Sequence, residues 1–130
     1  MDMERRSYSI REMCDTFAVT PRALRFYEDE SLIAPERRGT VRLYSDRDRA
    51  RLTLILRGKR VGFSLADIRE MLDLYDIGDG QQTQCRVTLQ RCRERVDALQ
   101  RQKVDIDTTI GELEKYIASL DPEIRQGSSE

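Results

Sequence analysis

The sequence predicts a mainly α-helical fold with one short β-hairpin, followed by a single long helix. Three observations predict it: serine and threonine residues at positions typical of helix N-caps, a Gly39-Thr40 pair beside residues of strand-like alternation, and a heptad repeat over residues 85–120. A chain of 130 residues is long enough to form the hydrophobic core of about one domain. The long helix is therefore expected to extend from a small head.

Two short helices are expected near the N-terminus. Ser9 and Glu12 form a capping box, and the apolar residues that follow recur at helical spacing, namely Ile10, Met13, Cys14 and Phe17. Thr20 and Pro21 mark a second start, because proline is pre-set for the first helical position and lacks the amide left unpaired there. Only residues 18–19 separate these helices, which indicates a tight turn.

The second helix has the features of a DNA recognition helix. Arg22 and Arg25 lie near its N-terminal end, and Leu24 lies one turn from Tyr27 or Glu28. The side chains of Arg22, Arg25 and Phe26 divide between the faces of this helix. A short amphipathic helix of this kind, reached through a tight turn from another helix, suits the major groove of DNA. Helix pairs are common in proteins that bind no DNA, so the pair alone leaves other functions open.

A basic hairpin is expected after Pro35. Gly39 and Thr40 form its tip, and beyond them Val41 and Leu43 alternate with Arg42 and Tyr44 at strand period. A basic hairpin can lie along the phosphate backbone as a wing. Residues 1–76 are therefore expected to form a winged helix-turn-helix DNA-binding head that includes two further helices.

The third and fourth helices also begin with capping serines. Ser45 with Asp48 caps the third helix, and Ser64 with Asp67 caps the fourth. Gly58 is expected to interrupt the third helix. Lys59 and Arg60 at its end either stabilise the helix dipole or contact a phosphate, and both interpretations stay open. A polar linker, residues 77–83, follows the fourth helix.

The long helix is expected over residues 84–120, before a short tail, residues 121–130. Its seam residues follow one another in alternating steps of four and three: Cys85, Leu89, Cys92, Val96, Leu99, Lys103, Ile106, Ile110, Leu113, Ile117 and Leu120. This heptad repeat is the signature of a two-helix coiled coil. At 1.5 Å per residue the helix would extend roughly 55 Å, more than the head could cover, so a homodimer is predicted. Lys103 is the single charged seam position, of the kind that fixes register.

Composition excludes several classes of protein. Residues 1–63 hold 14 Lys and Arg against 10 Asp and Glu, and residues 64–130 hold 9 against 14, so polyanion binding belongs to the first half. No apolar run approaches the roughly 20 residues of a membrane span, and a cytoplasmic location is expected. Without histidine, Ser-His and Cys-His catalysis are excluded, so no enzyme is predicted. Three cysteines do not suggest a disulfide framework, and no metal ion or cofactor is expected.

Three motifs carry a resemblance to a known family: RFYE at residues 25–28, RLYS at 42–45 and GFSL at 62–65. With the terminal helix, the chain resembles the MerR family of bacterial transcriptional regulators over nearly its whole length. The resemblance implies an antiparallel coiled-coil dimer that binds a pseudo-palindromic promoter element and distorts its spacer for RNA polymerase. It implies these DNA-binding residues, with Tyr44 partly packed beneath the wing: Thr20, Arg22, Arg25, Tyr27, Arg37, Arg38, Arg42, Tyr44, Lys59 and Arg60.

A narrower resemblance concerns the signal. The run LILRGKRVGFSL at residues 54–65 and DLYD at residues 73–76 resemble the branch that controls leucine and isovalerate catabolism, which implies an acyl-CoA-type effector. Metal-responsive members carry a cysteine at the start of the long helix, as Cys85 does, and further cysteines after it. Residues 121–130 contain none.

Two other hypotheses stay open. Cys85 and Cys92, one heptad apart, suit packing in an apolar seam, but they would also suit a thiol-responsive or metal-responsive regulator. A protein-docking module on a coiled coil would explain the long helix equally well, but it leaves the arginine-rich wing without a role.

Overall fold

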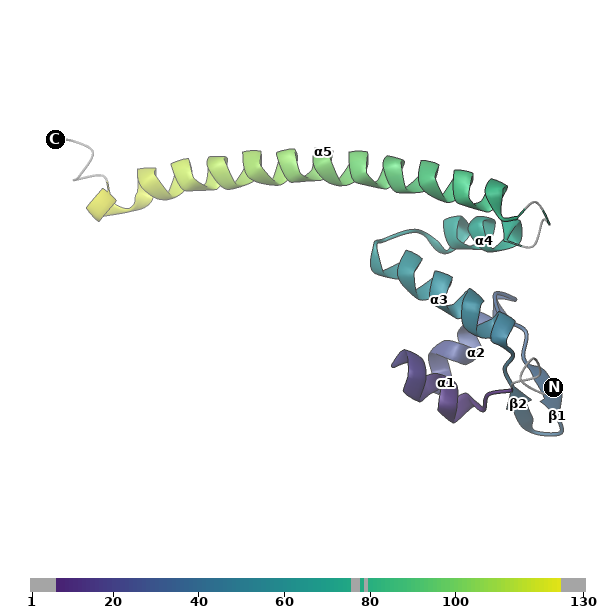
Figure 1. Ribbon diagram of the computed structural model, residues 1–130. Coiled ribbons are helices and arrows are strands. Elements are labelled where there is room, and N and C mark those ends of the chain that lie inside the picture. Colours follow the sequence, from purple (N-terminus) through teal and green to yellow (C-terminus); the bar gives the residue numbers. More distant parts are fainter. Residues whose placement is uncertain (1–6, 76–77, 79, 125–130) are drawn as a thin grey trace. The chain divides into compact units, whose positions relative to one another are not determined.

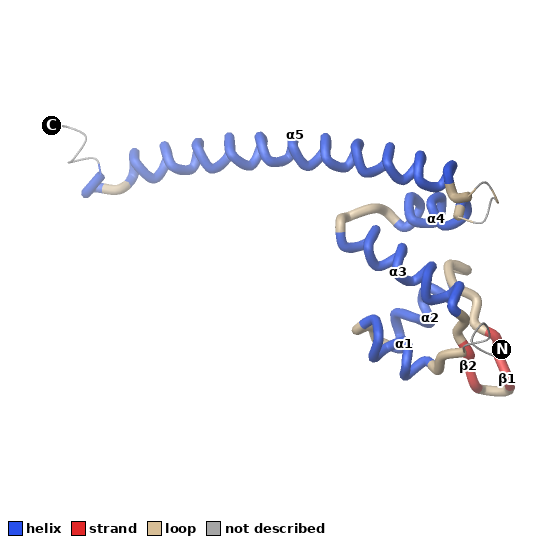
Figure 2. Tube along the Cα trace, viewed as in Figure 1, coloured by secondary structure: helices blue, strands red, loops and turns tan. Residues whose placement is uncertain are grey.

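The computed structural model describes residues 7–75, 78 and 80–124 of the chain. In chain order the elements are α1 (Ile10–Phe17), α2 (Pro21–Asp29), β1 (Glu36–Arg38), β2 (Val41–Leu43), α3 (Asp46–Arg60), α4 (Leu65–Leu74) and α5 (Gln82–Leu120), as Figures 1 and 2 show. The chain divides into two compact units after Thr88. A helical fold with one small two-stranded sheet confirms the predicted fold class.

Local sequence signals set the starts of the first two helices. Ser9 Oγ accepts a hydrogen bond from the Glu12 amide at 3.1 Å, and Glu12 accepts one from the Ser9 amide at 2.9 Å. Thr20 Oγ1 accepts from the Ala23 amide at 3.1 Å. Ala18 adopts a left-handed conformation, with φ of 54°, and this conformation closes α1 and begins the tight turn to α2.

The wing is an antiparallel hairpin in which Arg37 lies opposite Arg42. Gly39, with φ of 64°, forms the tip, as the sequence predicted. The sequence did not predict that Tyr8 would join the base of the hairpin. The backbone amides of Tyr8 and Tyr44 donate to each other's carbonyl oxygens at 2.8 Å, so the segment before α1 is held against the end of β2.

Two buried charged side chains near the start of α3 hold neighbouring segments in place. Asp48 accepts hydrogen bonds at 3.0 Å from the amides of Ser45 and Ala34. Arg51 donates to the carbonyl oxygen of Leu32 at 2.6 Å and to that of Leu72 at 3.4 Å. The segment after α2 and the end of α4 are thereby both tied to α3.

The core of the head lies where α1 to α4 meet. It consists of buried apolar side chains from these helices and from the segments before and after the wing: Met13, Leu24, Tyr27, Leu32, Ile33, Tyr44, Leu52, Ile55, Ile68, Met71 and Leu72. Of the apolar residues that follow helical spacing in and after α4, Ile68, Met71 and Leu72 are buried and Tyr75 is half-buried. Leu24 and Tyr27, the inner face of α2, fix which way its arginines point.

Gly58 does not interrupt α3, and the expectation that it would was wrong. The helix continues through Gly58 to Arg60. A Cβ atom at Gly58 would lie 2.9 Å from Ile68 Cγ1 and 3.5 Å from Phe63 Cδ2. Glycine is present because α4 packs against α3 at this point, and the close approach leaves no room for a side chain.

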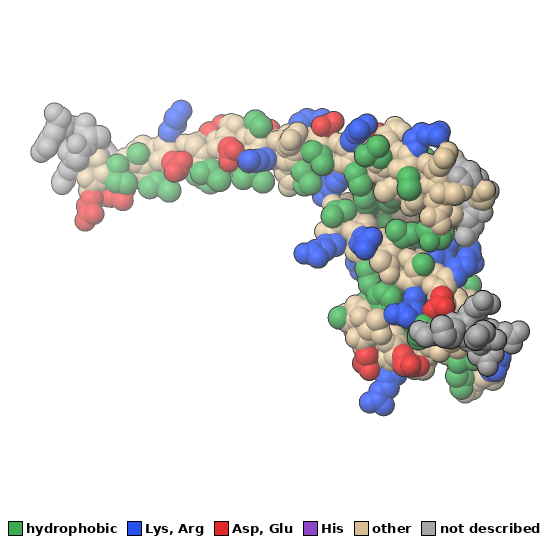
Figure 3. All heavy atoms as spheres, in the orientation of Figure 1, with side chains coloured by type: hydrophobic (Ala, Val, Ile, Leu, Met, Phe, Trp, Pro, Cys, Tyr) green, Lys and Arg blue, Asp and Glu red, His purple; other side chains and the backbone are tan. Residues whose placement is uncertain are grey.

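The long helix begins at Gln82, two residues before the expected start, and ends at Leu120 as expected. Asp76 at the end of the predicted head, Ile77 and Asp79 of the predicted linker, and residues 125–130 of the tail lie outside the described residues. The apolar seam residues from Leu89 to Leu120 are 42–66% exposed. Green side chains form a row along α5 in Figure 3. In the single chain, this apolar stripe of α5 is therefore exposed to solvent.

None of the helices in residues 7–75 and 80–124 is both long enough and apolar enough to cross a membrane.

We expect replacement of Gly58 by alanine to destabilise the protein by about 1–3 kcal/mol. The added methyl group forces Ile68 to move in a packed core, and this outweighs the gain of up to about 1 kcal/mol in helix propensity. Chemical denaturation at fixed protein concentration measures the change. Gly111→Ala is the matched control: a Cβ there meets nothing within 4 Å, so stability should rise. Equal stabilisation by both substitutions would contradict the close packing of α3 and α4.

Candidate nucleic-acid interface

The outer face of α2 presents an exposed basic surface. Arg22 and Arg25 are exposed, and Thr20, the N-cap, is also exposed at the start of the helix. The opposite face is fixed by Leu24 and Tyr27, which are 0% and 3% exposed. A helix held by one face, with guanidinium groups on the other, can insert into the major groove, where arginine pairs bidentately with guanine.

Glu28 joins the recognition helix to the wing. Its Oε1 accepts a hydrogen bond from Arg42 Nε at 2.7 Å, and its Oε2 accepts one from Arg37 Nη2. Arg37 and Arg42 lie opposite each other on β1 and β2, so a single carboxylate holds both strands. The wing is therefore fixed relative to α2 by two charge-assisted hydrogen bonds.

These contacts are reflected in the pKa values of Glu28 and Arg42. Burial of Glu28 alone would raise the pKa of its carboxyl group. Hydrogen bonds from Arg37 and Arg42, together with their positive charges, outweigh burial and lower that pKa below its ordinary value. The hydrogen bond to Glu28 in turn raises the pKa of Arg42. Glu28 is thus held as a carboxylate, and the pair is strongest where it is ionised.

Lys59 and Arg60 are exposed at the end of α3. Lys59 Nζ lies 3.5 Å from the Tyr27 hydroxyl oxygen, at the limit of a hydrogen bond, and 5.9 Å from the centre of the Tyr27 ring. The structure thus brings together two of the residues expected to contact DNA, from α2 and from the end of α3.

The remaining expected contact residues differ in their surroundings. Arg38 is exposed on β1, and its Nε donates to Glu36 at 3.1 Å. Tyr44 is 0% exposed, and its hydroxyl is the one buried side-chain polar atom without a hydrogen-bond partner in the described part of the chain. Burial raises the pKa of Tyr44. Tyr44 was expected among the DNA-binding residues, but in this conformation it packs beneath the wing and does not reach its surface.

Sequence reasoning missed two contributors to this surface. The role of Glu28 went unnoticed, although it is part of the RFYE motif, because its partners lie 9 and 14 residues away. Arg49 was not singled out either. Its guanidinium carbon lies 4.4 Å from the centre of the Tyr8 ring and 5.9 Å from that of Phe17. Arg49 therefore helps to hold the residue that closes the base of the wing.

The cysteines do not form a metal centre in the described residues. Cys85 and Cys92 are exposed on α5, and Cys14 is half-buried in the head, where burial raises the pKa of its thiol. Among the described residues, no group of three or more Cys, Asp or Glu side chains is arranged to hold a metal ion.

A capped helix pair, a recognition helix with exposed arginines and a wing tied to that helix define a winged helix-turn-helix protein. The model of the MerR HTH regulatory protein family matches residues 8–74, and the model described as "MerR, DNA binding" matches residues 49–116. The chain belongs to the MerR family of HTH regulators and is a DNA-binding transcriptional regulator of that family.

Individual relatives agree with this assignment. The chain is 32% identical to the HTH-type transcriptional regulator ZntR of Escherichia coli (strain K12), over 87% of this chain and 75% of ZntR. Among solved structures, the N-terminus of MtaN, the Bacillus subtilis multidrug transporter activator, is 28% identical with a TM-score of 0.65, covering 85% of this chain and 97% of that one.

A third relative was solved with DNA. HiNmlR, a MerR family regulator that lacks the sensor domain, was crystallised bound to promoter DNA. It is 25% identical with a TM-score of 0.53, and the match covers 86% of this chain and 79% of HiNmlR. These relatives support the family and give no support to the narrower branch of leucine and isovalerate regulators.

We expect Glu28→Gln to lower stability by about 1 kcal/mol near neutral pH, because a charge-assisted pair is replaced by weaker hydrogen bonds. Because the pKa of Glu28 is lowered in the folded state, its stabilisation is complete above its ordinary value of 4.5 and is lost as the pH falls through the lowered value. The parent protein should therefore lose more stability than the variant on acidification from about pH 6 to about pH 3.

Urea denaturation across that pH range measures this effect. Glu36→Gln is the matched control, because Glu36 and its partner Arg38 are largely exposed and such pairs contribute about 0.2–1 kcal/mol or less. Identical pH profiles for Glu28→Gln and the parent protein would show that Glu28 does not hold the wing.

Proposed function

We propose that this protein is a homodimeric, sequence-specific regulator that binds a pseudo-palindromic promoter element through two winged heads. The observation that carries the DNA-binding part is the arrangement of Arg22 and Arg25 on an exposed helix face beside a wing fixed by Glu28. Major-groove contacts by the helix and backbone contacts by the wing would then occur together.

Each proposed contact residue takes a role from its place in the fold. Arg22 and Arg25 would face bases and phosphates, with Thr20 at the helix start. Arg37, Arg38 and Arg42 would line the wing, and Lys59, Arg60 and the Tyr27 hydroxyl would meet a flanking phosphate. We assign Tyr44 a positioning role beneath the wing, since it is fully buried.

Homodimerisation is proposed from the exposed stripe of α5. The seam of Leu89, Cys92, Val96, Leu99, Lys103, Ile106, Ile110, Leu113 and Ile117 lies on one face of the helix and is exposed along its whole length. A second copy of the same stripe would cover it by knobs-into-holes packing. Ile124, 46% exposed, continues the alternating steps one position beyond Leu120.

Charges beside the seam favour an antiparallel pair. One position of each heptad lies directly after the seam residues that are spaced seven apart from residue 85 to residue 120. The residues at this position are basic at the start of the seam and acidic towards its end: Arg86, Arg93, Gln100, Asp107, Glu114 and Asp121. In an antiparallel coiled coil this position lies beside the same position of the partner helix. In a parallel coiled coil it would face Thr88, Arg95, Gln102, Thr109 and Tyr116, which provide no acidic partner.

One antiparallel register uses the whole seam. It pairs Leu89 with the partner's Leu120, Val96 with the partner's Leu113, and Lys103 with the partner's Ile106. Arg93 then lies near the partner's Glu114, and Arg86 lies near the partner's Asp121. Lys103 falls next to the two-fold axis of this pair, where one polar seam residue can select a register.

The regulatory action that we propose is distortion of the promoter spacer in the presence of RNA polymerase. HiNmlR, which shares the fold, was crystallised on promoter DNA, and this supports a promoter as the target. Bending a site of 20–30 base pairs by 40–90° costs on the order of 1–6 kcal/mol, and sequences that deform easily would be preferred for that reason. Circular-permutation gel shifts would measure the bend directly.

Two hypotheses concern the signal. An acyl-CoA-type effector is implied by the narrower resemblance, and isovaleryl-CoA added to the protein–DNA complex tests it. Sensing through Cys85 and Cys92 is the alternative; both thiols are exposed on the single chain, but the proposed dimer would cover Cys92 in the seam. The two cysteines are seven positions apart, about 10.5 Å along the helix, which is too far for both thiolates of one chain to hold a single zinc ion.

We expect Arg25→Ala and Arg42→Ala each to weaken binding to duplex DNA from the upstream region of its own gene at least about 10-fold. The double variant should lose specific binding. Each lost phosphate contact should also reduce the slope of log affinity against log salt by about one. A salt series of fluorescence-anisotropy titrations measures both quantities.

Arg101→Ala is the matched control for this experiment. It removes the same charge from an exposed position of α5 outside the head and the seam, so binding should be unchanged. Intact binding by the Arg25/Arg42 double variant would refute the proposed interface. If the parent protein did not bind duplex DNA but bound a protein partner, the protein-docking hypothesis would be favoured.

A charge exchange tests the dimer and its register. Arg93→Glu alone and Glu114→Arg alone should each weaken the dimer, because like charges then lie beside each other at both ends of the pair. The double variant should recover most of the lost dimerisation in the proposed register. In the register shifted by one heptad, Arg93 meets the partner's Asp107 and Glu114 meets the partner's Arg86, so the double variant would be the weakest.

Analytical ultracentrifugation across a concentration series gives the dimer dissociation constants. Lys115→Glu, an exposed charge change next to Glu114 but away from the seam, should leave the dimer constant nearly unchanged. A monomeric parent protein at micromolar concentration would exclude the coiled-coil homodimer altogether.

A further inference from the structure

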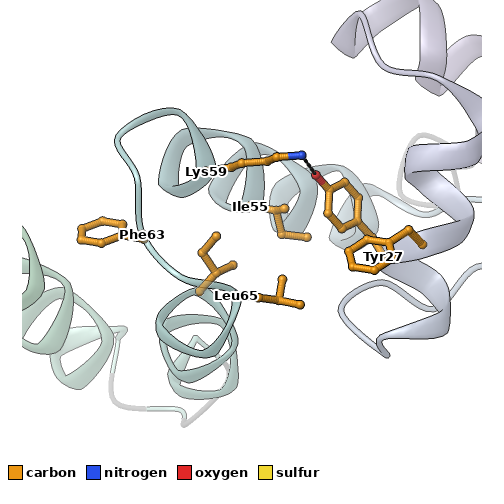
Figure 4. A pocket seen from close by; sticks show the side chains of 7 residues that line it. Tyr27, Ile55, Lys59, Phe63 and Leu65 are labelled. Atoms are coloured by element: carbon orange, nitrogen blue, oxygen red, sulfur yellow. Dashed lines mark hydrogen bonds between the residues drawn. The ribbon is translucent and has the colours of Figure 1, made fainter.

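A cavity of about 220 Å³ lies in the head, where α2, α3 and α4 meet. Figure 4 shows its lining side chains, with Lys59 and Tyr27 joined by their hydrogen bond. Six of the lining residues are apolar or aromatic, and Lys59 alone carries a charge among those described: Phe26, Tyr27, Ile55, Lys59, Phe63, Leu65 and Ile68. No role in the proposed DNA interface requires such a cavity.

The cavity runs from the core towards the surface. Ile55, Ile68 and Tyr27 are buried, whereas Phe26 is 48% exposed and Lys59 is exposed. A ligand could therefore enter from solvent and place an apolar part against buried aliphatic side chains. Its polar end would meet the Lys59 ammonium group and the Tyr27 hydroxyl, which lie 3.5 Å apart.

We propose that this cavity is a binding site for a small aliphatic carboxylate. Small-molecule sites are mostly apolar with a few polar groups that fix orientation, and this lining fits that description. The volume lies below the roughly 300–1,000 Å³ of pockets for drug-sized ligands, so the ligand is small. One ammonium and one hydroxyl donor match the two oxygens of a carboxylate, and the ammonium repels a cationic ligand.

The site would couple ligand binding to DNA binding, and this part rests on the proposed function. Lys59 and Tyr27 are also proposed to meet a flanking phosphate. A carboxylate on Lys59 competes for the same charge, so the ligand weakens DNA binding, and by linkage DNA weakens ligand binding by the same factor. The binding site itself does not depend on this coupling, and it can be tested without DNA.

The test is isothermal titration of the full-length protein, in the absence of DNA, with butanoate, pentanoate and hexanoate. We expect saturable binding of one ligand per chain, tightening about fourfold for each added methylene group until the cavity is full. Hexanol should bind at least 10-fold more weakly than hexanoate, and hexylamine should not bind. Equal binding of hexanoate and hexylamine, or no saturable hexanoate binding, would overturn the proposal.

Two pairs of variants locate the ligand. Lys59→Met keeps an unbranched apolar side chain but removes the charge, and it should weaken hexanoate binding about 10-fold while leaving hexanol binding unchanged. Arg57→Met removes an exposed charge from the same helix outside the lining and should change neither. If the two substitutions weakened hexanoate binding equally, Lys59 would act only through long-range charge and would not contact the carboxylate.

Fluorescence provides a second, local readout, because the chain contains no tryptophan and a single introduced indole reports only on its own surroundings. Phe63→Trp places one indole in the lining, and its emission should change with hexanoate at the concentrations found by titration. Val61→Trp, at an exposed position outside the lining, should not respond. If hexanoate binds and the affinity for DNA does not change, the binding site stands and its coupling to DNA is refuted. If the parent protein does not bind DNA at all, the proposed function fails, but hexanoate binding can still be measured.

Discussion

The arrangement of the head depends on two buried charged side chains near the start of α3. Asp48 holds the amides of Ser45 and Ala34, and Arg51 holds the carbonyl oxygens of Leu32 and Leu72. Buried charges are tolerated only when hydrogen bonds satisfy them, so these bonds restrict the backbone to one arrangement. The chain leaving the recognition helix, the end of the wing and the end of α4 are thereby positioned together.

A second set of contacts acts at the C-terminal end of α2. Arg69 on α4 donates to the carbonyl oxygen of Glu30 at 2.7 Å and to its carboxylate at 3.3 Å, next to the C-terminal end of α2. Glu28 holds the wing through Arg42 and Arg37. The recognition helix is therefore fixed on one side to α4, which precedes the long helix, and on the other side to the wing. Because Ile68, Met71 and Leu72 of α4 also belong to the core, the Arg69 contacts and the core together hold α4 and α2 in one arrangement.

How much of this could be read from the sequence depends on the range of each interaction. The caps at Ser9, Thr20, Ser45 and Ser64 involve residues three positions apart, so their spacing alone predicted the helix starts. The heptad spacing likewise predicted one continuous helix, and Gly39 predicted the tip of the hairpin.

Tertiary contacts escaped prediction. The partners of Glu28 and Arg51 lie 9 to 21 residues away, and periodicity says nothing about which carboxylate meets which guanidinium. Gly58 was misread for a related reason: helix propensity treats glycine as a break, whereas here the nearby Ile68 accounts for it. The cavity also depends on three helices meeting, which no local pattern records.

The wing contact has a consequence for how a dimer would deform DNA. One carboxylate shared between Arg37 and Arg42 removes part of the positive charge that the wing offers to phosphates, which by itself weakens binding. In exchange, the wing and α2 form one rigid surface. Bending a promoter requires that strain fall on the DNA and not on the protein, because a wing free to move would follow the unbent backbone and leave the spacer unchanged. If the protein acts by distorting its site as proposed, the Glu28 contacts would help to place the strain on the DNA, while they neutralise part of the positive charge of the wing.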